Sequence, residues 1–344
     1  MKRTRVNWER RIGRRLKLRD LFILFTTVQS GSMAKAAAHL GISQPAVSEA
    51  INDLEHAFGV RLLDRTPQGV EPTIYGRALV KRGLAAFDEL RQSVQEIEFL
   101  ADPTVGELRI GTIEPMAASL IPAIIDPLCQ KYPGVLFHVT QAPGVAQQYR
   151  DLRERNVELI LGRMVTPNAE EDLHAEILFE EPMYVATGLH SKWAGRDTIE
   201  LAELVNERWV LPPPDSVIGS VIANAFRASG VDVPGSAVVC NSLQLVNALL
   251  PTGRFLALLP HSLLHFSAAR LLIEALPVKL QAQPPPVGIV TLKNRTISPV
   301  AQLFIETART VAAPLNAPHL RPAITAAWPH TAVPAASTRL AGLR

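Results

Sequence analysis

One short segment of the sequence carries side chains that are suited to reading the edges of DNA bases. The amide of Gln44 can pair with adenine through two hydrogen bonds, and the carboxylate of Glu49 can accept one from cytosine. Pro45 can contact the methyl group of thymine. Apolar residues such as Val47 and Ile51 recur at helical spacing on the opposite face. The segment is therefore predicted to form a helix whose polar face can enter the major groove of DNA.

The residues around this segment predict a helix-turn-helix. A first amphipathic helix is expected over residues 18–31. Ser32 can cap a second helix that stops at Gly41, and Ser43 can cap the third helix, over residues 44–58. The second and third helices, joined by a short turn, would expose the N-terminal end of the third one to DNA phosphates.

Two short extended segments, predicted at residues 61–63 and 70–73, surround the turn Thr66-Pro67-Gln68-Gly69 and form a wing. An ordinary exposed helix, or a solvated arginine in the wing, is the alternative for these polar residues. We expect DNA contacts from both elements and the caps beside them, namely Ser32, Ser43, Gln44, Pro45, Ser48, Glu49, Asn52, Arg65, Thr66, Gln68 and Thr73.

The distribution of charge supports a nucleic-acid partner for this part of the chain. The formal net charge of the whole protein is only +3, but residues 1–75 hold twelve basic and seven acidic side chains. A basic N-terminal part on a near-neutral remainder favours binding to a polyanion. Residues 1–17 are predicted to form a flexible basic arm.

A long helix is predicted after the winged helix-turn-helix, which takes residues 18–75, and it forms a linker over residues 76–102. One alternative is a single amphipathic helix that packs on its own domain. The other, which we favour, is a dimerising coiled-coil-like helix whose seam repeats every three or four residues at Val80, Phe87, Leu90, Val94, Ile97 and Ala101.

Beyond residue 102 the pattern changes to strands that alternate with helices. This order predicts an α/β domain at residues 103–313, built on largely parallel sheets, followed by an Ala- and Pro-rich disordered tail at residues 314–344. A helix is expected at residues 116–131, and strands are expected at residues 107–111, 135–140, 157–161, 183–187, 209–211, 237–240, 255–259 and 287–292.

The N-terminal segment resembles the LysR-type transcriptional regulators. The resemblance is carried by the contiguous stretch Gly31-Ser32-Met33-Ala34-Lys35-Ala36-Ala37-Ala38-His39-Leu40-Gly41-Ile42-Ser43-Gln44-Pro45-Ala46-Val47-Ser48, and by Ile51, Leu54-Glu55, Phe58-Gly59, Leu62-Leu63, Arg65, Thr73 and Gly76.

The resemblance implies a sequence-specific regulator that binds double-stranded DNA and is controlled by a small-molecule co-inducer. It implies a dimerising linker helix and a periplasmic-binding-protein-like effector domain of two α/β lobes. Lobe 1 is then expected at about residues 103–162 and 263–313, and lobe 2 at about residues 163–262. Regulators of this type usually work as homodimers or homotetramers, and RNA polymerase is a further expected partner.

The co-inducer is expected between the two lobes, at strand ends and helix N-termini. Glu114 would repel a carboxylate and so favours a neutral, sugar-like ligand, whereas Arg163 could hold a carboxylate by a bidentate contact. We expect the neutral ligand. The alternative for each candidate is a loop residue that only caps a helix; the candidates are Thr112, Ile113, Glu114, Arg163, Ser216, Asn241 and Ser242.

Other classes of protein find little support in the sequence. His261 and His265 share a predicted helix face, but no HExxH arrangement surrounds them, and Glu180-Glu181 is more typical of a solvated pair than of an acid/base couple. Phosphate-binding and nucleophile motifs are missing too, so we expect no enzyme, metal or cofactor. A DNA-binding protein without a ligand stays as an alternative.

The sequence also bears on the compartment of the protein. Cys129 and Cys240 cannot form a disulfide framework or a four-ligand zinc site, which suits a reducing interior. We find neither a signal-peptide pattern nor an apolar run of membrane-spanning length, and therefore expect no membrane contact and a cytoplasmic protein.

Overall fold

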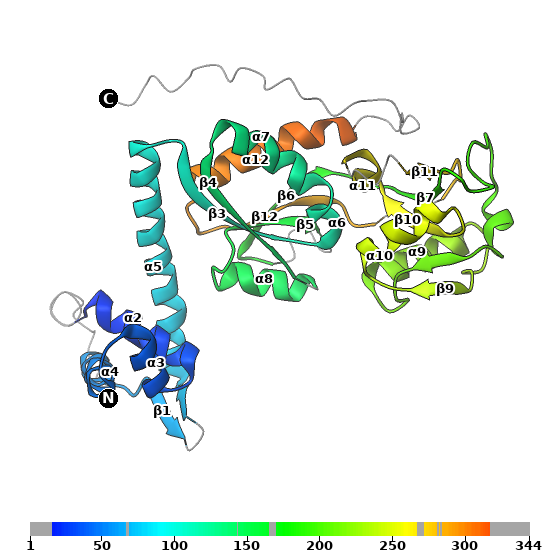
Figure 1. Ribbon diagram of the computed structural model, residues 1–344. Helices are drawn as coiled ribbons and strands as arrows, with labels where there is room; N and C mark the ends of the chain where they lie inside the picture. The colour runs from blue at the N-terminus through cyan, green and yellow to red at the C-terminus, as the bar shows by residue number, and fades with distance from the viewer. Residues whose placement is uncertain are drawn as a thin grey trace. The chain divides into compact units, whose positions relative to one another are not determined.

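The computed structural model describes residues 16–66, 69–142, 144–164, 170–266, 272–280, 282 and 284–316. Its contacts divide the chain into two units, Met1–Val94 and Gln95–Arg344, and each is described separately below (Figure 1). Most of the predicted basic arm and of the predicted tail lies outside the described residues. Within the described ranges, no helix has both the length and the apolar character that a bilayer span needs.

The first unit is a three-helix domain with a two-stranded wing, joined to a long helix. Its interior holds Leu24, Val47, Ile51 and Leu54, which are 2% exposed or less. Leu16 packs against the same core, so the predicted flexible arm ends before this residue. The elements are α2 (Leu18–Ser30), α3 (Met33–Leu40), α4 (Gln44–Phe58), β1 (Leu63–Thr66), β2 (Gly69–Pro72) and α5 (Ile74–Ala101).

The first three helices have the predicted bounds because local signals fix both of their ends. Gly31, Gly41 and Gly59 adopt left-handed backbone conformations with φ of 64°, 64° and 71°, and each of them ends a helix. The hydroxyl of Ser43 accepts a hydrogen bond from the Ala46 N–H at the start of α4.

The first strand of the wing begins later than the predicted residues 61–63. The carboxylate of Glu55, near the end of α4, accepts hydrogen bonds from the N–H groups of Leu62 and Leu63 at 2.7 and 3.2 Å. These contacts hold the chain against the helix, and strand pairing begins only with Leu63 opposite Pro72. The start of the strand therefore depends on hydrogen bonds to Glu55, which the sequence of the short extended segment does not predict.

The second unit contains two five-stranded sheets, and the first has the strand order β4-β3-β5-β12-β6. Helices α7 and α12 cover one face of it and α8 the other (Figure 1). The strands are β3 (Val105–Thr112), β4 (Gly134–Gln141), β5 (Leu159–Arg163), β6 (Leu173–Phe179) and β12 (Val287–Leu292); the helices are α6 (Glu114–Ala117), α7 (Leu120–Lys131), α8 (Val145–Arg153) and α12 (Pro299–Ala312), with the 3-10 turn η4 (Ala313–Asn316).

The second sheet has the order β11-β7-β10-β8-β9. Trp209 and Phe226 meet edge to face in its core, with ring centroids 5.5 Å apart. The strands are β7 (Met183–Gly188), β8 (Trp209–Leu211), β9 (Ser236–Val239), β10 (Leu256–Pro260) and β11 (Ile273–Ala275); the helical elements are η1 (Leu201–Leu204), α9 (Val217–Ala228), α10 (Leu243–Leu249), η2 (Leu250–Thr252) and α11 (His261–Phe266).

The expectation of largely parallel sheets is wrong, because both sheets are mixed. In the first, β12 runs antiparallel to β5 and β6, and in the second, β7 runs antiparallel to β10 and β11. The chain leaves one sheet and enters the other between β6 and β7, and it returns through β12. Strands next to such crossings need not be parallel, since no helix of the same lobe connects them.

The sheet pairing also corrects the predicted lobe boundaries at residues 162/163 and 262/263. Strand β6 pairs with β12, so lobe 1 continues to Phe179, and β11 pairs with β7, so lobe 2 continues to Ala275. The predicted helix at residues 116–131 is two helices, separated at Ala118 and Ser119. Neither β6 nor β11 has the continuous apolar run by which the other strands of the domain are predicted.

The predicted start of the disordered tail at residue 314 is wrong for three residues. Leu315 is 1% exposed and belongs to the core of lobe 1, and the Asn316 amide donates to the Leu178 carbonyl at 2.8 Å. The turn η4 therefore closes the domain.

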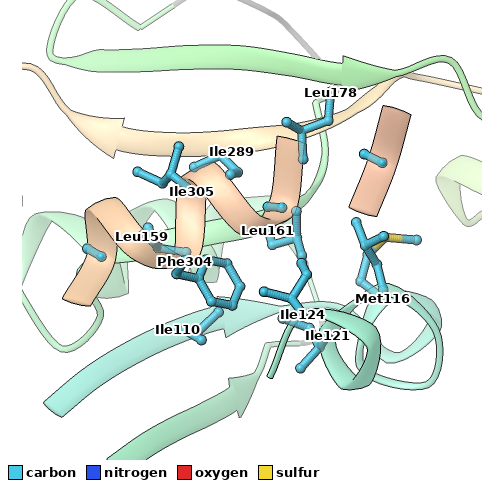
Figure 2. Packing of buried hydrophobic residues seen from close by; sticks show 14 of the residues in the cluster. Ile110, Met116, Ile121, Ile124, Leu159, Leu161, Leu178, Ile289, Phe304 and Ile305 are labelled. Atoms are coloured by element: carbon cyan, nitrogen blue, oxygen red, sulfur yellow. The ribbon is translucent and has the colours of Figure 1, made fainter. Parts of the chain in front are cut away.

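The core of lobe 1 is formed where α7 and α12 pack on the sheet (Figure 2). Phe304 of α12 lies among Ile110, Leu159 and Ile124 and is fully buried. A buried aromatic side chain at this point joins α7 and α12 to the strands β3 and β5.

Replacing Phe304 with alanine should therefore lower the free energy of unfolding by about 3–5 kcal/mol, because the substitution leaves a cavity. Urea unfolding of the full chain followed by circular dichroism measures this change. The control is Leu136→Ala in β4, where the side chain is 56% exposed and the loss should stay below about 1 kcal/mol. Equal losses would show that Phe304 is not a central core residue.

Candidate DNA interface and effector site

The polar face of α4 is exposed as predicted. Gln44, Pro45, Glu49 and Asn52 are exposed and Ser48 is half-buried. The opposite face is anchored in the core of the domain. The side chains that can read bases therefore lie together on one surface of one helix, at its N-terminal end.

The two serine residues before the helices differ in what their hydroxyl groups do. Ser43 caps α4, so its oxygen already accepts a backbone hydrogen bond. Ser32 precedes α3 in an extended conformation, and its side chain makes no capping hydrogen bond. Ser32 is thus better placed than Ser43 to offer its hydroxyl to a phosphate.

The wing is fixed to the turn between α2 and α3 through two glycine residues. The Val70 N–H donates to the Gly31 carbonyl at 3.0 Å. Gly69 has a φ of +139°, and a Cβ atom there would lie 2.2 Å from the same carbonyl oxygen. Only glycine allows this approach. The sequence predicts Gly69 as a turn residue. It does not predict the contact with Gly31, because the two residues lie 38 positions apart in the chain.

The remaining predicted wing residues differ in the hydrogen bonds that they make within the domain. The Thr73 hydroxyl donates to the Arg61 carbonyl at 2.8 Å and accepts from the Gly76 N–H at 3.1 Å, so it caps α5. The Thr66 hydroxyl donates to the Gly69 carbonyl at 3.4 Å across the turn. Arg65 pairs with Val70 in the strand register. The side chain of Arg65 and all of Gln68 lie outside the described part.

Several of the predicted effector residues have structural partners instead. Thr112 is fully buried, and its hydroxyl donates to the Leu161 carbonyl at 2.8 Å. Ser216 caps α9 by accepting from the Gly219 N–H at 3.0 Å, and Ser242 caps α10 by accepting from the Leu245 N–H at 3.3 Å. Ile113 packs on the core of lobe 1. These four residues fit the alternative of caps and packing residues, whereas Asn241 is exposed.

Glu114 connects the two lobes. Its Oε1 atom accepts a hydrogen bond from the Leu243 N–H at 3.0 Å, and Leu243 is the first residue of α10 in lobe 2. A carboxylate at that place complements the positive end of the helix. The sequence predicts a position between the two lobes for Glu114, but it does not predict the hydrogen bond to Leu243.

Arg163 lies at the end of β5 with its side chain only 8% exposed. Its Nη2 atom is 3.3 Å from Oε2 of Glu181, and Oε1 of Glu181 accepts a hydrogen bond from the Ser262 N–H at 3.2 Å. Burial lowers the pKa of the Arg163 guanidinium, and the charge of Glu181 opposes that shift. The prediction that Glu181 belongs to a solvated pair is wrong, since this residue is 1% exposed.

The two histidine residues of α11 pack with each other and with a neighbouring aromatic ring. The rings of His261 and His265 have centroids 6.0 Å apart, and the His261 ring lies 5.7 Å from that of Tyr184. Among the residues that the structure describes, no group of three potential metal ligands occurs. Aromatic packing accounts for these positions.

Comparison with known proteins agrees with this architecture. The family described as LysR substrate binding domain matches residues 101–337, and the family described as bacterial regulatory helix-turn-helix protein, lysR family, matches residues 18–77. The chain belongs to the LysR family. It is therefore a DNA-binding transcriptional regulator that carries an effector-binding domain.

Individual LysR-family regulators are similar over most of the chain. GbpR of Azospirillum brasilense is 27% identical over 86% of each chain. TdcA of Escherichia coli K12 is 26% identical, over 85% of this chain and 92% of TdcA. A full-length OxyR variant from Pseudomonas aeruginosa has a TM-score of 0.62 at 20% identity, over 89% of this chain and 99% of that one. The last comparison shows the fold alone.

The contact between Gly69 and Gly31 leads to a prediction about DNA affinity. Gly69→Ala should displace the wing, because the added Cβ would overlap the Gly31 carbonyl. We expect binding to operator DNA to weaken by about tenfold, as when one or two phosphate contacts are lost. A gel-shift titration at fixed salt measures the affinity.

Gly59→Ala is the matched control for this substitution. Gly59 has a φ of +71° and open space around its Cβ position, so the variant has backbone strain without a clash. If both variants bind DNA equally well, the wing does not depend on the contact between Gly69 and Gly31.

Proposed function

We propose that α4 reads an operator in the major groove and that the wing and the basic arm bind the flanking phosphates. The observation that carries this proposal is the exposed row Gln44, Pro45, Glu49 and Asn52, which lies on one face of α4 and is left uncovered by the described part of the chain. A recognition helix held by an apolar inner face is the usual arrangement for such reading. The wing adds affinity but little sequence information.

The proposal includes self-association through α5. The predicted seam divides into two parts with different surroundings. Val80 and Phe87 pack on the core of their own domain, and the Phe87 ring lies 5.4 Å from that of Phe25. Farther along the helix, Leu90, Val94 and Ile97 of the predicted seam are 46%, 54% and 66% exposed and Ala101 is exposed too, while Leu100, outside the predicted seam, is 74% exposed. A row of exposed apolar side chains at helical spacing favours pairing with a second copy.

The proposed regulator works as a homodimer or homotetramer, binds a small molecule between its lobes, and acts on transcription by RNA polymerase at its promoter. In this proposal the chain binds ligands and catalyses no reaction. Support for a site between the lobes comes from Glu114, Arg163 and Glu181, whose contacts join residues of both lobes.

Two substitutions separate base reading from phosphate binding. Gln44→Ala should cost about 1–3 kcal/mol on the operator and relax the preference at one base position, because a bidentate amide contact is lost. Arg65→Ala should weaken binding to all sequences by a similar factor and reduce the salt dependence. Gel shifts on operator and random duplexes at several salt concentrations measure both effects.

The contrast between the two variants is the test of the assignment. Gln44→Ala must lose more affinity for the operator than for random DNA. If both duplexes are affected equally by this variant, Gln44 binds the backbone and a different residue reads the bases.

A charge in the exposed seam should weaken the dimer. Val94→Asp places a carboxylate in the centre of the apolar row, and we expect the dimer dissociation constant to rise at least about tenfold. Analytical ultracentrifugation of the full chain measures it. The control is Gln95→Asp, a half-buried position on the side of α5 away from the row, which should leave association unchanged. A dimer unaffected by both substitutions would place the interface elsewhere.

A further inference from the structure

Arg163 stands where the segments that join the two lobes come together. The Met164 N–H donates to the Pro286 carbonyl at 2.8 Å, next to the pairing of Arg163 with Val287. The crossing before β7 is tied to the start of α11, because the His261 N–H donates to the Pro182 carbonyl at 2.9 Å. The guanidinium of Arg163 reaches this crossing point through Glu181.

The hydrogen-bonding capacity of this guanidinium is only partly used. Its Nη1 atom is buried and has no hydrogen-bond partner among the residues that the structure describes. Its Nη2 atom has Glu181 at 3.3 Å, and that carboxylate is shared with the Ser262 N–H. Buried donors are almost always paired, and an unpaired charged donor is especially costly. Oε2 of Glu181 is likewise buried without a hydrogen-bond partner in the described part of the chain, so the two charged groups face each other in imperfect alignment, and Nη1 is the donor that no acceptor reaches.

We infer that Arg163 anchors a small carboxylate-bearing effector through Nη1. This inference rests on the proposed effector site between the lobes and names the chemical class that the site takes. A carboxylate matches a guanidinium in geometry as well as in charge, since two oxygens can face two N–H groups. The positive charge is already opposed by Glu181, so a carboxylate differs from a sugar or polyol hydroxyl in offering Nη1 a charge-assisted hydrogen bond.

The contacts of Glu114 remove the main argument for a neutral ligand. The sequence favours such a ligand because a free acidic group would repel a carboxylate. In the structure, the Glu114 carboxylate is engaged by the Leu243 N–H at the start of α10. Its charge is complemented there by the helix end and does not require a hydroxyl donor from a ligand.

The position of Arg163 also connects the ligand to the lobe junction. A bound carboxylate would compete with Glu181 for the guanidinium. Glu181 holds the backbone of Ser262, and the Ser262 hydroxyl lies 3.3 Å from that of Ser119 in lobe 1. Occupation of the site thus changes the polar contacts that tie one lobe to the other.

Calorimetry of the full-length chain tests the inference with pairs of probes. Pyruvate, 2-oxoglutarate and benzoate are titrated beside pyruvamide, 2-oxoglutaramide and benzamide, with glucose, galactose, sodium chloride and sodium phosphate as further probes. We expect at least one carboxylate to bind about tenfold or more tightly than its amide, as a charged partner for a buried guanidinium requires.

Three variants assign the binding to Arg163. Arg163→Met alone would leave Glu181 buried without a partner, so the double variant Arg163→Met/Glu181→Gln is used, and its fold is checked by circular dichroism. This variant should lose carboxylate binding. Glu181→Gln alone removes the competing carboxylate and leaves the guanidinium without its internal partner, so in preparations whose fold circular dichroism confirms it should keep or tighten carboxylate binding. Arg153→Met is the matched control, since that exposed arginine pairs with Glu170 and Asp172.

Each remaining outcome overturns the inference. These outcomes are tight binding of a sugar or an amide that survives in the double variant, carboxylate binding that the double variant retains, binding of inorganic anions only, and binding of none of the probes. Operator binding is measured on the same preparations by gel shift. Intact operator binding beside a failed titration rejects the carboxylate and leaves the proposed DNA-binding function standing, whereas loss of operator binding in the unmodified chain rejects that function.

Discussion

The buried carboxylate of Glu181 is the contact on which the arrangement of the effector domain depends. It is 1% exposed, and it meets the guanidinium of Arg163 from lobe 1 and the backbone of Ser262 after β10. Removing either charge alone would leave the other one buried without compensation, which is strongly destabilising. The pair therefore constrains both chain crossings at once, and lobe 2 is oriented by residues that lie outside its own sheet.

Other elements also begin at backbone N–H groups that donate to a glutamate carboxylate. The Glu158 carboxylate accepts from the Ser298 N–H at 2.7 Å before α12, and Glu114 does the same for Leu243 at the start of α10. In the first unit, Glu55 holds the N–H groups of Leu62 and Leu63 before the wing. Free N–H groups at the start of an element need acceptors, and a carboxylate is the strongest one available. Acidic side chains thus place the helices and the wing that carry the proposed sites.

These contacts explain which parts of the fold the sequence could predict. The helices of the first unit are bounded by Ser43 and by glycine residues in left-handed conformations, and all of these signals are local. The α/β class and most strands of the second unit follow from periodicity. The start of β1 and the boundaries of the lobes depend on pairings such as β6 with β12, which lie more than a hundred residues apart in the chain. Periodicity contains no information on such pairs.

The two candidate sites differ in the same way: the DNA-binding face depends on local pattern, and the effector site depends on contacts between distant residues. The exposed face of α4 could be predicted, because a helix with one apolar face must present the other one to solvent. For the effector site, residue type and position after a strand were insufficient. Ser216 and Ser242 satisfy their own helices, and Thr112 bonds to a neighbouring strand. What distinguishes Arg163 is a buried donor that no residue of the described part of the chain satisfies, which only the three-dimensional structure reveals.

A ligand can control the regulator only if it binds two arrangements of the domain with different affinity. A carboxylate at Nη1 meets this condition, because Arg163 lies in lobe 1, Glu181 lies in the segment that crosses to lobe 2, and a second anion competes with Glu181 for the guanidinium. The sharing of one guanidinium between an internal and an external carboxylate makes ligand affinity and lobe contact reciprocal: whatever strengthens the contact of Glu181 with Arg163 must weaken the binding of the acid. The buried pair is thus both the structural constraint at the crossing and the element through which an acid would act.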